Sequence, residues 1–272
     1  MGENRVSHLR AFSNNVRALG LEGALQWTLY RARRRWKLFP PGTFRVRPRG
    51  FPAPLEMRAN ESSDADVFGP IFLAEEYGEL LDFQPSFIVD LGANIGLSSA
   101  WFLSRFPKAK VLAVEPDPDN FALCRKNLAM FGDRAQTLLG AAWSQRMKLS
   151  LVRGSFRDGR EWASQVAERA DSDACVEVEG WDIPSMLSLT DEKMVDLLKV
   201  DIEKGELELF SKGCEAWLPF VRAICIELHG KECEEMFFAA LRSFDFDLSH
   251  SGELTICKNL RLRSAVSRAS QF

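Results

Sequence analysis

Short apolar runs alternate with helical segments through most of this 272-residue chain. The runs with strand character are residues 86–91, 110–115 and 135–142, and the segments between them with helical periodicity are 97–106 and 120–131. Strands that alternate with helices are typical of a parallel sheet with helices on both faces. The sequence therefore predicts an α/β fold built on a doubly wound, mostly parallel sheet.

The second half of the chain continues this pattern. Further strands are expected at 149–152, 175–179, 197–202 and 223–228. The last two expected strands, 246–249 and 254–257, are separated by a Ser-Gly turn, which predicts a terminal antiparallel pair.

The first 59 residues have a different pattern. Apolar residues recur at steps of three and four through 5–36, which predicts one or two helices, and Pro40-Pro41-Gly42 ends them. Residues 44–47 and 55–58 predict a hairpin or a pair of edge strands. The expected organisation is a basic helical extension with short strands over 1–59, a main domain over 60–262 and a frayed tail over 263–272.

Charge is distributed unevenly along the chain. Residues 1–50 hold eleven Lys or Arg and two acids, whereas the whole chain has a net charge of −3 and a pI of about 5.8. The overall charge gives no reason to expect a nucleic acid partner. For the basic stretch 31–37, a solvated helix end and weak contact with an anionic membrane surface both stay open.

The remaining composition indicates a cytoplasmic protein. No apolar run is long enough for a transmembrane segment, and the N-terminus lacks the apolar core of a secretory signal. The six cysteines form no C-x-x-C pair and no ligand-like spacing with the three histidines, so we expect buried, reduced thiols and no zinc site.

A glycine-containing turn follows the first predicted core strand. The strand ends in Asp90 and continues into Gly92-Ala-Asn-Ile-Gly96, where glycines permit a tight turn and close approach of a ligand. The second strand ends in Glu115, whose carboxylate can accept hydrogen bonds from the hydroxyls of an adenosine ribose, and Asn120 lies just beyond, near the expected adenine side. Ligands of open parallel sheets bind at these strand ends.

Two cofactors share this arrangement. A dinucleotide site needs G-x-G-x-x-G so that a pyrophosphate can rest on the helix end, whereas this chain has G-x-N-x-G directly after Asp90. An acid at that place suits a cationic amino-acid group better than a pyrophosphate. The pattern favours S-adenosylmethionine, and an NAD(P)-dependent oxidoreductase is the alternative.

Several motifs in order resemble the FkbM family of methyltransferases. They lie between about residues 55 and 260 and read Ser63-Asp64, Val67-Phe68, Glu76-Tyr77, Val89-Asp-Leu-Gly-Ala-Asn-Ile-Gly96, Val114-Glu-Pro-Asp-Pro-Asp-Asn120, Asn127, Leu198-Lys-Val-Asp-Ile-Glu203 and Ile224-Cys-Ile-Glu-Leu-His229. The resemblance implies a class I methyltransferase fold of Rossmann-like type, S-adenosylmethionine as methyl donor, and O-methylation of a sugar, glycan or secondary metabolite.

The resemblance also marks the residues expected at the cofactor. They are Asp90, Gly92, Asn94, Gly96, Glu115, Pro116 and Asn120, with Asp64 and Tyr77 on a segment that covers the cofactor. For Asp64 and Tyr77, a capping acid and a packing tyrosine are equally good interpretations. One position departs from the family, because Lys204 stands where glycine is usual; Gly205 is a candidate to serve the same turn.

Methyl transfer to a hydroxyl needs alignment of acceptor and donor and removal of a proton. Asp201 ends a core strand, and Glu227 and His229 alternate on the next one, so they share one face. His229 or Asp201 is the expected base, and a structural His229 is the alternative. Two oxygen ligands suit magnesium, but no third carboxylate is evident from the sequence, so we expect no metal.

The acceptor is the least constrained part of the prediction. Residues 153–175 are the expected insertion over the acceptor, and Trp143, Trp162, Trp181 and Trp217 are divided between an acceptor cleft and the core. A non-catalytic methyltransferase-fold scaffold is a third hypothesis, supported by Lys204 alone. The sequence predicts neither the acceptor's identity nor the oligomeric state.

Overall fold

The computed structural model describes residues 2–36, 42–59, 62–152, 165–167 and 176–263. Its main sheet contains the strands β3 (Phe87–Leu91), β4 (Lys110–Glu115), β5 (Ala135–Leu139), β10 (Leu197–Val200), β11 (Ile224–Glu227), β12 (Phe244–Ser251) and β13 (Leu254–Leu262). Their order is β12-β13-β11-β10-β3-β4-β5. The five strands from β11 to β5 are parallel, and β13 and β12 join antiparallel. The predicted doubly wound sheet with a terminal antiparallel pair is confirmed.

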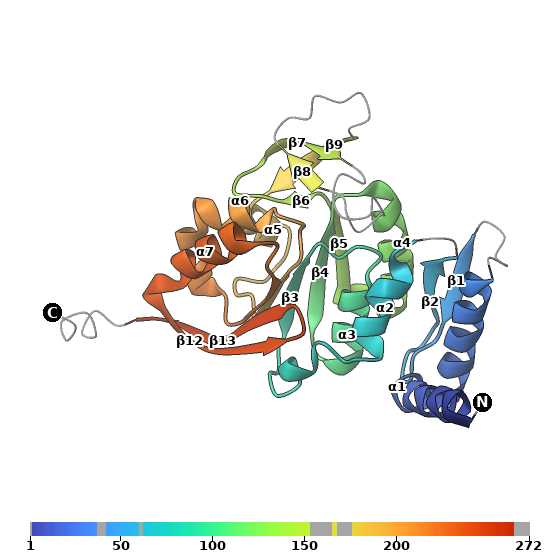
Figure 1. Ribbon diagram of the computed structural model, residues 1–272. Helices are drawn as coiled ribbons and strands as arrows, with labels where there is room; N and C mark the ends of the chain where they lie inside the picture. The colour runs from blue at the N-terminus through green and yellow to red at the C-terminus, as the bar shows by residue number, and fades with distance from the viewer. Residues whose placement is uncertain (1, 37–41, 60–61, 153–164, 168–175, 264–272) are drawn as a thin grey trace.

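Helices cover both faces of this sheet (Figure 1). They are α2 (Asp64–Phe72), α3 (Leu97–Arg105), α4 (Pro118–Leu128), α5 (Ile183–Leu187), α6 (Glu206–Ser211) and α7 (Lys231–Ala240). Short 3-10 helices lie at Gly78–Leu80, Ala129–Arg134, Cys214–Ala216, Leu218–Phe220 and Leu241–Ser243. Of these helices, the sequence pattern predicted α3 and α4 but not α2, α5, α6 or α7.

Side chains of the central strands alternate between two hydrophobic clusters. In β3, Ile88 packs in the cluster that contains Trp101, and Val89 packs in the cluster that contains Trp217. Because successive side chains of a strand point to opposite faces, a strand buried on both faces must be apolar throughout. This explains why the core strands read as continuous apolar runs.

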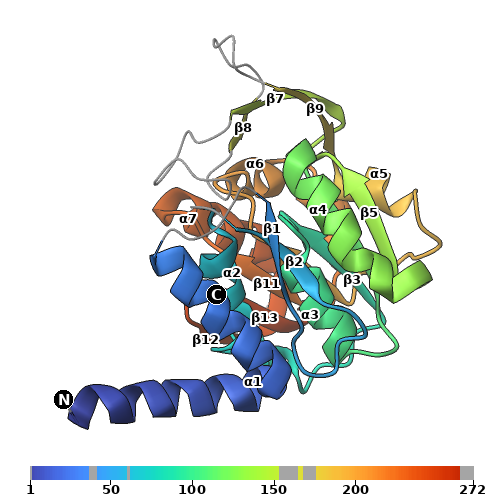
Figure 2. The ribbon, with the colours of Figure 1, turned by 90° about the vertical axis from the view of Figure 1, so that its right-hand side faces the viewer.

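The N-terminal segment forms one long kinked helix and a hairpin. Helix α1 (Gly2–Arg35) bends at Gly20, where φ is 77°, and β1 (Thr43–Val46) pairs antiparallel with β2 (Leu55–Arg58). The half of α1 before the bend extends away from the rest of the molecule (Figure 2). The other half packs on the domain, since Trp27 stacks on Phe68 at 4.7 Å between ring centroids. This part of the extension therefore shares the core of the main domain.

A second sheet lies beyond the carboxyl ends of the main strands. It contains β6 (Ala141–Ala142), β7 (Met147–Val152), β8 (Gln165–Ala167) and β9 (Val176–Trp181) in the order β6-β9-β7-β8. The single strand predicted over 135–142 is thus divided between the two sheets at Gly140. A Cβ at Gly140 would lie 2.6 Å from the Trp181 ring, so glycine allows the chain to cross close to this indole.

Some predictions concern residues outside the described ranges. These include most of the 153–175 insertion, Trp162, Cys175 and the tail after residue 263. The five described cysteines are buried and free. In the described part of the chain, none of the helices combines the length and the apolar character needed to cross a membrane.

Candidate functional site

The site lies where the strand order of the sheet reverses. From β3 the chain proceeds to β4 and β5 on one side, and from β10 to β11 on the other. Ligands of open α/β sheets bind in the crevice at this switch point, outside the carboxyl ends of the strands. The turns after β3 and β10 are in contact, because a Cβ at Gly92 would lie 1.8 Å from the carbonyl oxygen of Asp201. Gly92 also has a φ of 74°, so this turn needs glycine for two reasons.

Glu115 holds the glycine turn from the neighbouring strand. Its Oε2 accepts a hydrogen bond from the Asn94 amide at 2.7 Å, and its Oε1 accepts from the Asp117 amide at 3.0 Å and from Asn120 Nδ2 at 3.3 Å. Burial raises the pKa of Glu115 to about 7, although these hydrogen bonds act to lower it. The carboxylate thus borders the site and orders the backbone of two turns.

Asp90 is buried beneath the glycine turn. Its Oδ2 accepts hydrogen bonds from the hydroxyls of Ser98 and Ser99, both at 2.6 Å, and its Oδ1 lies 3.1 Å from Lys199 Nζ. Lys199 also donates to the Gly92 carbonyl at 2.9 Å. Burial acts to lower the pKa of Lys199, but Asp90 and Asp201 hold it above the usual range. The carboxylate of Asp90 therefore has three protein partners and acts on the turn through Lys199.

The sequence interpretation missed the importance of Lys199. The signal is visible in the motif, because a lysine interrupts the apolar run Leu197-Leu-Lys-Val200 of a strand that is buried on both faces. A lysine is almost never fully buried unless it is paired. Its partner follows only from the parallel pairing of β10 with β3, which sets Lys199 opposite Asp90.

The segment before β3 contributes to the site unevenly. Asp64 is fully buried, and its carboxylate lies 2.6 Å from Arg58 Nη2. It also accepts a hydrogen bond of 2.7 Å from the Arg58 backbone amide, so it joins α2 to β2. Tyr77 and Glu76 line the cavity at the switch point. Burial raises the pKa of Glu76 to about 7.

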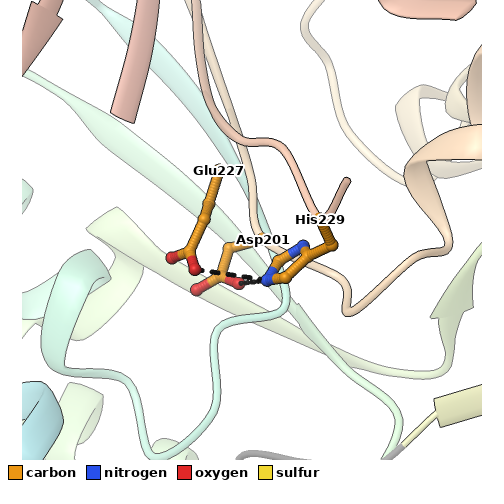
Figure 3. A group of neighbouring side chains, drawn as sticks. All are labelled: Asp201, Glu227 and His229. Carbon is orange, nitrogen blue, oxygen red and sulfur yellow. Dashed lines mark ion pairs between the residues drawn. The ribbon is translucent and has the colours of Figure 1, made fainter. Parts of the chain in front are cut away.

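Asp201, Glu227 and His229 lie close together (Figure 3), and the first two of them line the cavity. Nε2 of His229 lies 3.2 Å from Glu227 Oε1 and 3.9 Å from Asp201 Oδ1. Asp201 directly follows β10, Glu227 ends β11, and His229 lies two residues beyond that strand rather than within it. The structure thus brings together the three residues that the sequence predicted to share a site.

Two further carboxylates face the same imidazole. Nδ1 of His229 is 3.0 Å from Glu206 Oε1, and Nε2 is 3.5 Å from Glu203 Oε2. Burial acts to lower the pKa of His229, but the neighbouring carboxylates, above all those of Glu206 and Glu227, raise it to about 10. As the side chains stand in the structure, the imidazole is protonated at neutral pH. The sequence interpretation gave Glu203 and Glu206 no role, although both lie in the motif after β10.

The turn that carries these acids has an unusual backbone. Glu203 and Lys204 both adopt positive φ, at 48° and 76°, whereas Gly205 has a φ of −63°. The hypothesis that Gly205 replaces the usual glycine one position later is therefore wrong. Lys204 itself takes the left-handed conformation, and as an exposed residue it places no bulk in the core. The Ile202 amide donates to Glu206 Oε1 at 3.0 Å and closes the turn.

One cavity joins the two ends of the site. Its lining includes Gly92, Glu115 and Asn120 of the glycine turn and the β4 end, and also Asp201 and Glu227. Trp143 also lines it, while Trp217 is buried in the core and Trp181 packs beneath Arg146, whose guanidinium carbon lies 4.1 Å from the ring centroid.

The doubly wound sheet, the glycine turn after β3 and the acid that ends β4 define a class I methyltransferase. The sequence of residues 90–250 matches the model of the methyltransferase FkbM domain, and the chain belongs to this family. The cofactor of the domain is S-adenosylmethionine, which answers the choice that the glycine spacing left open between this cofactor and a dinucleotide.

Two named methyltransferases are similar to this chain. Methyltransferase sdnD of Sordaria araneosa is 30% identical over 172 residues, which cover 52% of this chain and 65% of sdnD. The 2-O-methyltransferase NoeI of Sinorhizobium fredii is 28% identical over 169 residues, which cover 57% of this chain and 68% of NoeI. The chain thus spans slightly less than two thirds of sdnD.

Among solved structures, the S-adenosylhomocysteine-bound methyltransferase PaMTH1 of Podospora anserina aligns over 97% of each chain. The sequence identity is 13% and the TM-score is 0.49.

The described residues fit S-adenosylmethionine. The side-chain oxygens of Asn94 and Asn120 are buried and make no hydrogen bond in the described protein, and both residues line the cavity. A buried acceptor without a partner is costly, so these two oxygens are matched to a ligand that brings N–H or O–H donors. The amino groups and ribose hydroxyls of S-adenosylmethionine are such donors.

Proposed function

We propose that this chain transfers a methyl group from S-adenosylmethionine to a hydroxyl of a sugar, a glycan or another small metabolite. The observation that carries the proposal is that one cavity is lined by the glycine turn, by Glu115 and by Asp201 and Glu227, the two carboxylates that lie beside His229. The name of the relative NoeI, a 2-O-methyltransferase, agrees with a hydroxyl acceptor.

At the cofactor end, Gly92 and Gly96 provide the turn, and Glu115 and Asn120 bind the adenosine. Asn94 offers its free oxygen, and Pro116 and Tyr77 line the cavity beside the cofactor. Asp90 and Asp64 act as positioning residues, the first through Lys199 and the second through Arg58.

At the acceptor end, Asp201 and Glu227 orient the hydroxyl and help to remove its proton, and His229 positions these two carboxylates. The cofactor supplies an activated methyl group on its sulfonium, so the protein mainly has to align the two reactants. Asp201 suits this role because its side chain is 36% exposed and lines the cavity, unlike the more enclosed His229.

S-adenosylhomocysteine is expected to raise the melting temperature, whereas NAD and NADP leave it unchanged. A ligand at about 100 times its Kd adds about 2.7 kcal/mol to the stability, which is a shift of about 5–11 °C for a chain of this size. Thermal unfolding of the wild type and of Glu115→Ala tests the cofactor. An assay of labelled methyl transfer to hydroxylated acceptors then tests the reaction. A larger shift with a dinucleotide would contradict the cofactor, and binding without transfer to any hydroxylated acceptor would favour the scaffold hypothesis.

The affinity for S-adenosylhomocysteine is expected to rise with pH through about 7. Below that pH the raised pKa of Glu115 leaves its carboxyl protonated, and a neutral acid is a weaker acceptor for the ribose hydroxyls. If only the ionised form binds well, affinity at pH 8 is about tenfold higher than at pH 6. Calorimetric titration of the wild type and of Glu115→Gln checks this, and an equally steep profile in Glu115→Gln would assign the titration to another group.

A further inference from the structure

We propose that Asp201, Glu227 and His229 bind a divalent cation of the Mg²⁺ or Mn²⁺ type at the acceptor end of the cavity. The sequence predicted no metal, because it showed no third carboxylate near Asp201 and Glu227. The structure supplies an imidazole nitrogen and, beside it, the carboxylates of Glu203 and Glu206.

The spacing of the ligand atoms fits one ion. One nitrogen or oxygen from each of the three residues can be chosen so that all three atoms lie within 4.8 Å of one another. Ligand atoms about 2.1 Å from an octahedral ion are about 3 Å apart when adjacent and about 4.2 Å apart when opposite. The distances from His229 Nε2, 3.2 Å to Glu227 and 3.9 Å to Asp201, fall in this range.

The orientation of His229 is the independent observation. Its side chain is only 3% exposed, its Nδ1 bonds to Glu206, and its Nε2 points toward Asp201 and Glu227 without making a hydrogen bond (Figure 3). Ligating histidines commonly bond to a carboxylate through one ring nitrogen, which fixes the ring, and bind the metal through the other. Glu206 is in the position of that supporting carboxylate and is itself held by the Ile202 amide.

The charge of the cluster also suits a cation. Four carboxylates surround the imidazole, those of Asp201, Glu203, Glu206 and Glu227. Lys199 is paired mainly with Asp90, and of these four carboxylates it lies near that of Asp201 alone, at 3.7 Å. One imidazolium offsets only one of the four carboxylates, and a divalent cation bound at Nε2 would replace its proton. Hard oxygen ligands favour Mg²⁺ and Mn²⁺ over softer ions.

The role of the cation rests on the proposed function. Asp201 and Glu227 line the cavity, so a cation between them also faces the acceptor. There it would bind the acceptor hydroxyl and lower its pKa, and the proton would pass to solvent water. The acceptor oxygen then bonds to the methyl carbon as the carbon–sulfur bond breaks, and the electron pair of that bond stays on sulfur.

The test is a titration of the metal-depleted full chain with Mn²⁺, in which electron paramagnetic resonance measures the bound ion. We expect one Mn²⁺ per chain and at least tenfold weaker binding in Asp201→Asn, Glu227→Gln and His229→Gln. Glu232→Gln, an exposed acid at the start of α7, is the matched control and should bind as the wild type does. Circular dichroism and S-adenosylhomocysteine binding show that each variant is folded.

The outcomes separate the two proposals. No Mn²⁺ binding by the wild type, or equal binding by all three ligand variants, would overturn the cation site. If S-adenosylhomocysteine still binds and methyl transfer persists in excess chelator, the proposed function stands without the cation. If Mn²⁺ binds and is lost in the variants while no methyl transfer is found, the cation site stands and the proposed function fails.

Discussion

Lys199→Ala is expected to lower the free energy of unfolding by about 3–5 kcal/mol, because it leaves the buried carboxylate of Asp90 without its cation. Both side chains are almost completely enclosed, with 3% exposure for Lys199 and none for Asp90. Water cannot replace the lost partner at this depth, so the cost far exceeds that of a surface ion pair. Urea unfolding of the wild type and the variant measures the difference.

A double variant identifies the cause of this loss. Asp90→Asn/Lys199→Met removes both charges while roughly keeping the volumes, and it should recover most of the stability that Lys199→Ala loses. The amide side chain introduced by Asp90→Asn still offers one oxygen to the hydroxyls of Ser98 and Ser99. A loss below about 1 kcal/mol in Lys199→Ala would show that the pair is not the element that supports the glycine turn.

Gly92→Ala is expected to lower the free energy of unfolding by about 2–5 kcal/mol and to weaken S-adenosylhomocysteine binding. A left-handed φ costs an alanine about 1–2 kcal/mol, and the clash with the Asp201 carbonyl, at 1.8 Å from the new Cβ, adds about 1–3 kcal/mol. Relief of the clash requires that the turns after β3 and β10 move apart, and this displaces the turn that is proposed to bind the cofactor. Thermal unfolding and calorimetric titration give both values.

Gly252→Ala separates the cost of the backbone strain from the cost of the clash with Asp201. Gly252 also has a positive φ, 58°, but no atom lies within 4 Å of a Cβ placed there. The control should lose only the roughly 1–2 kcal/mol of backbone strain and should bind S-adenosylhomocysteine as the wild type does. Equal losses at Gly92 and Gly252 would show that the contact between the two turns has no energetic effect.

The Asp90–Lys199 pair and the contact between Gly92 and Asp201 belong to one connected set of interactions. Lys199 bonds to the Gly92 carbonyl and to Asp90, and Gly92 lies against the Asp201 backbone. The cofactor turn after β3 and the acceptor turn after β10 are therefore held by the same few groups. A change in either turn is expected to affect both ends of the cavity.

Much of the fold follows from the sequence because its signals are local. The continuous apolar runs, the glycine turn and the acid at the end of β4 report strands and strand ends without knowledge of their neighbours. They predicted the doubly wound sheet, the antiparallel pair β12-β13 and the meeting of Asp201, Glu227 and His229. The family resemblance, which the match over residues 90–250 shows to be correct, rests on the same residues.

The sequence by itself determined the class of fold and the family, because these depend on residue types at fixed spacings in several local motifs, and the cofactor follows from the family. Tertiary structure decided which carboxylates face a ligand and which are structural. Asp90 and Asp201 both end a parallel strand, yet the first is fully buried against Lys199 and the second is 36% exposed beside His229. Burial and partners are set by the pairing of strands that are distant in the sequence, and no local pattern encodes that pairing.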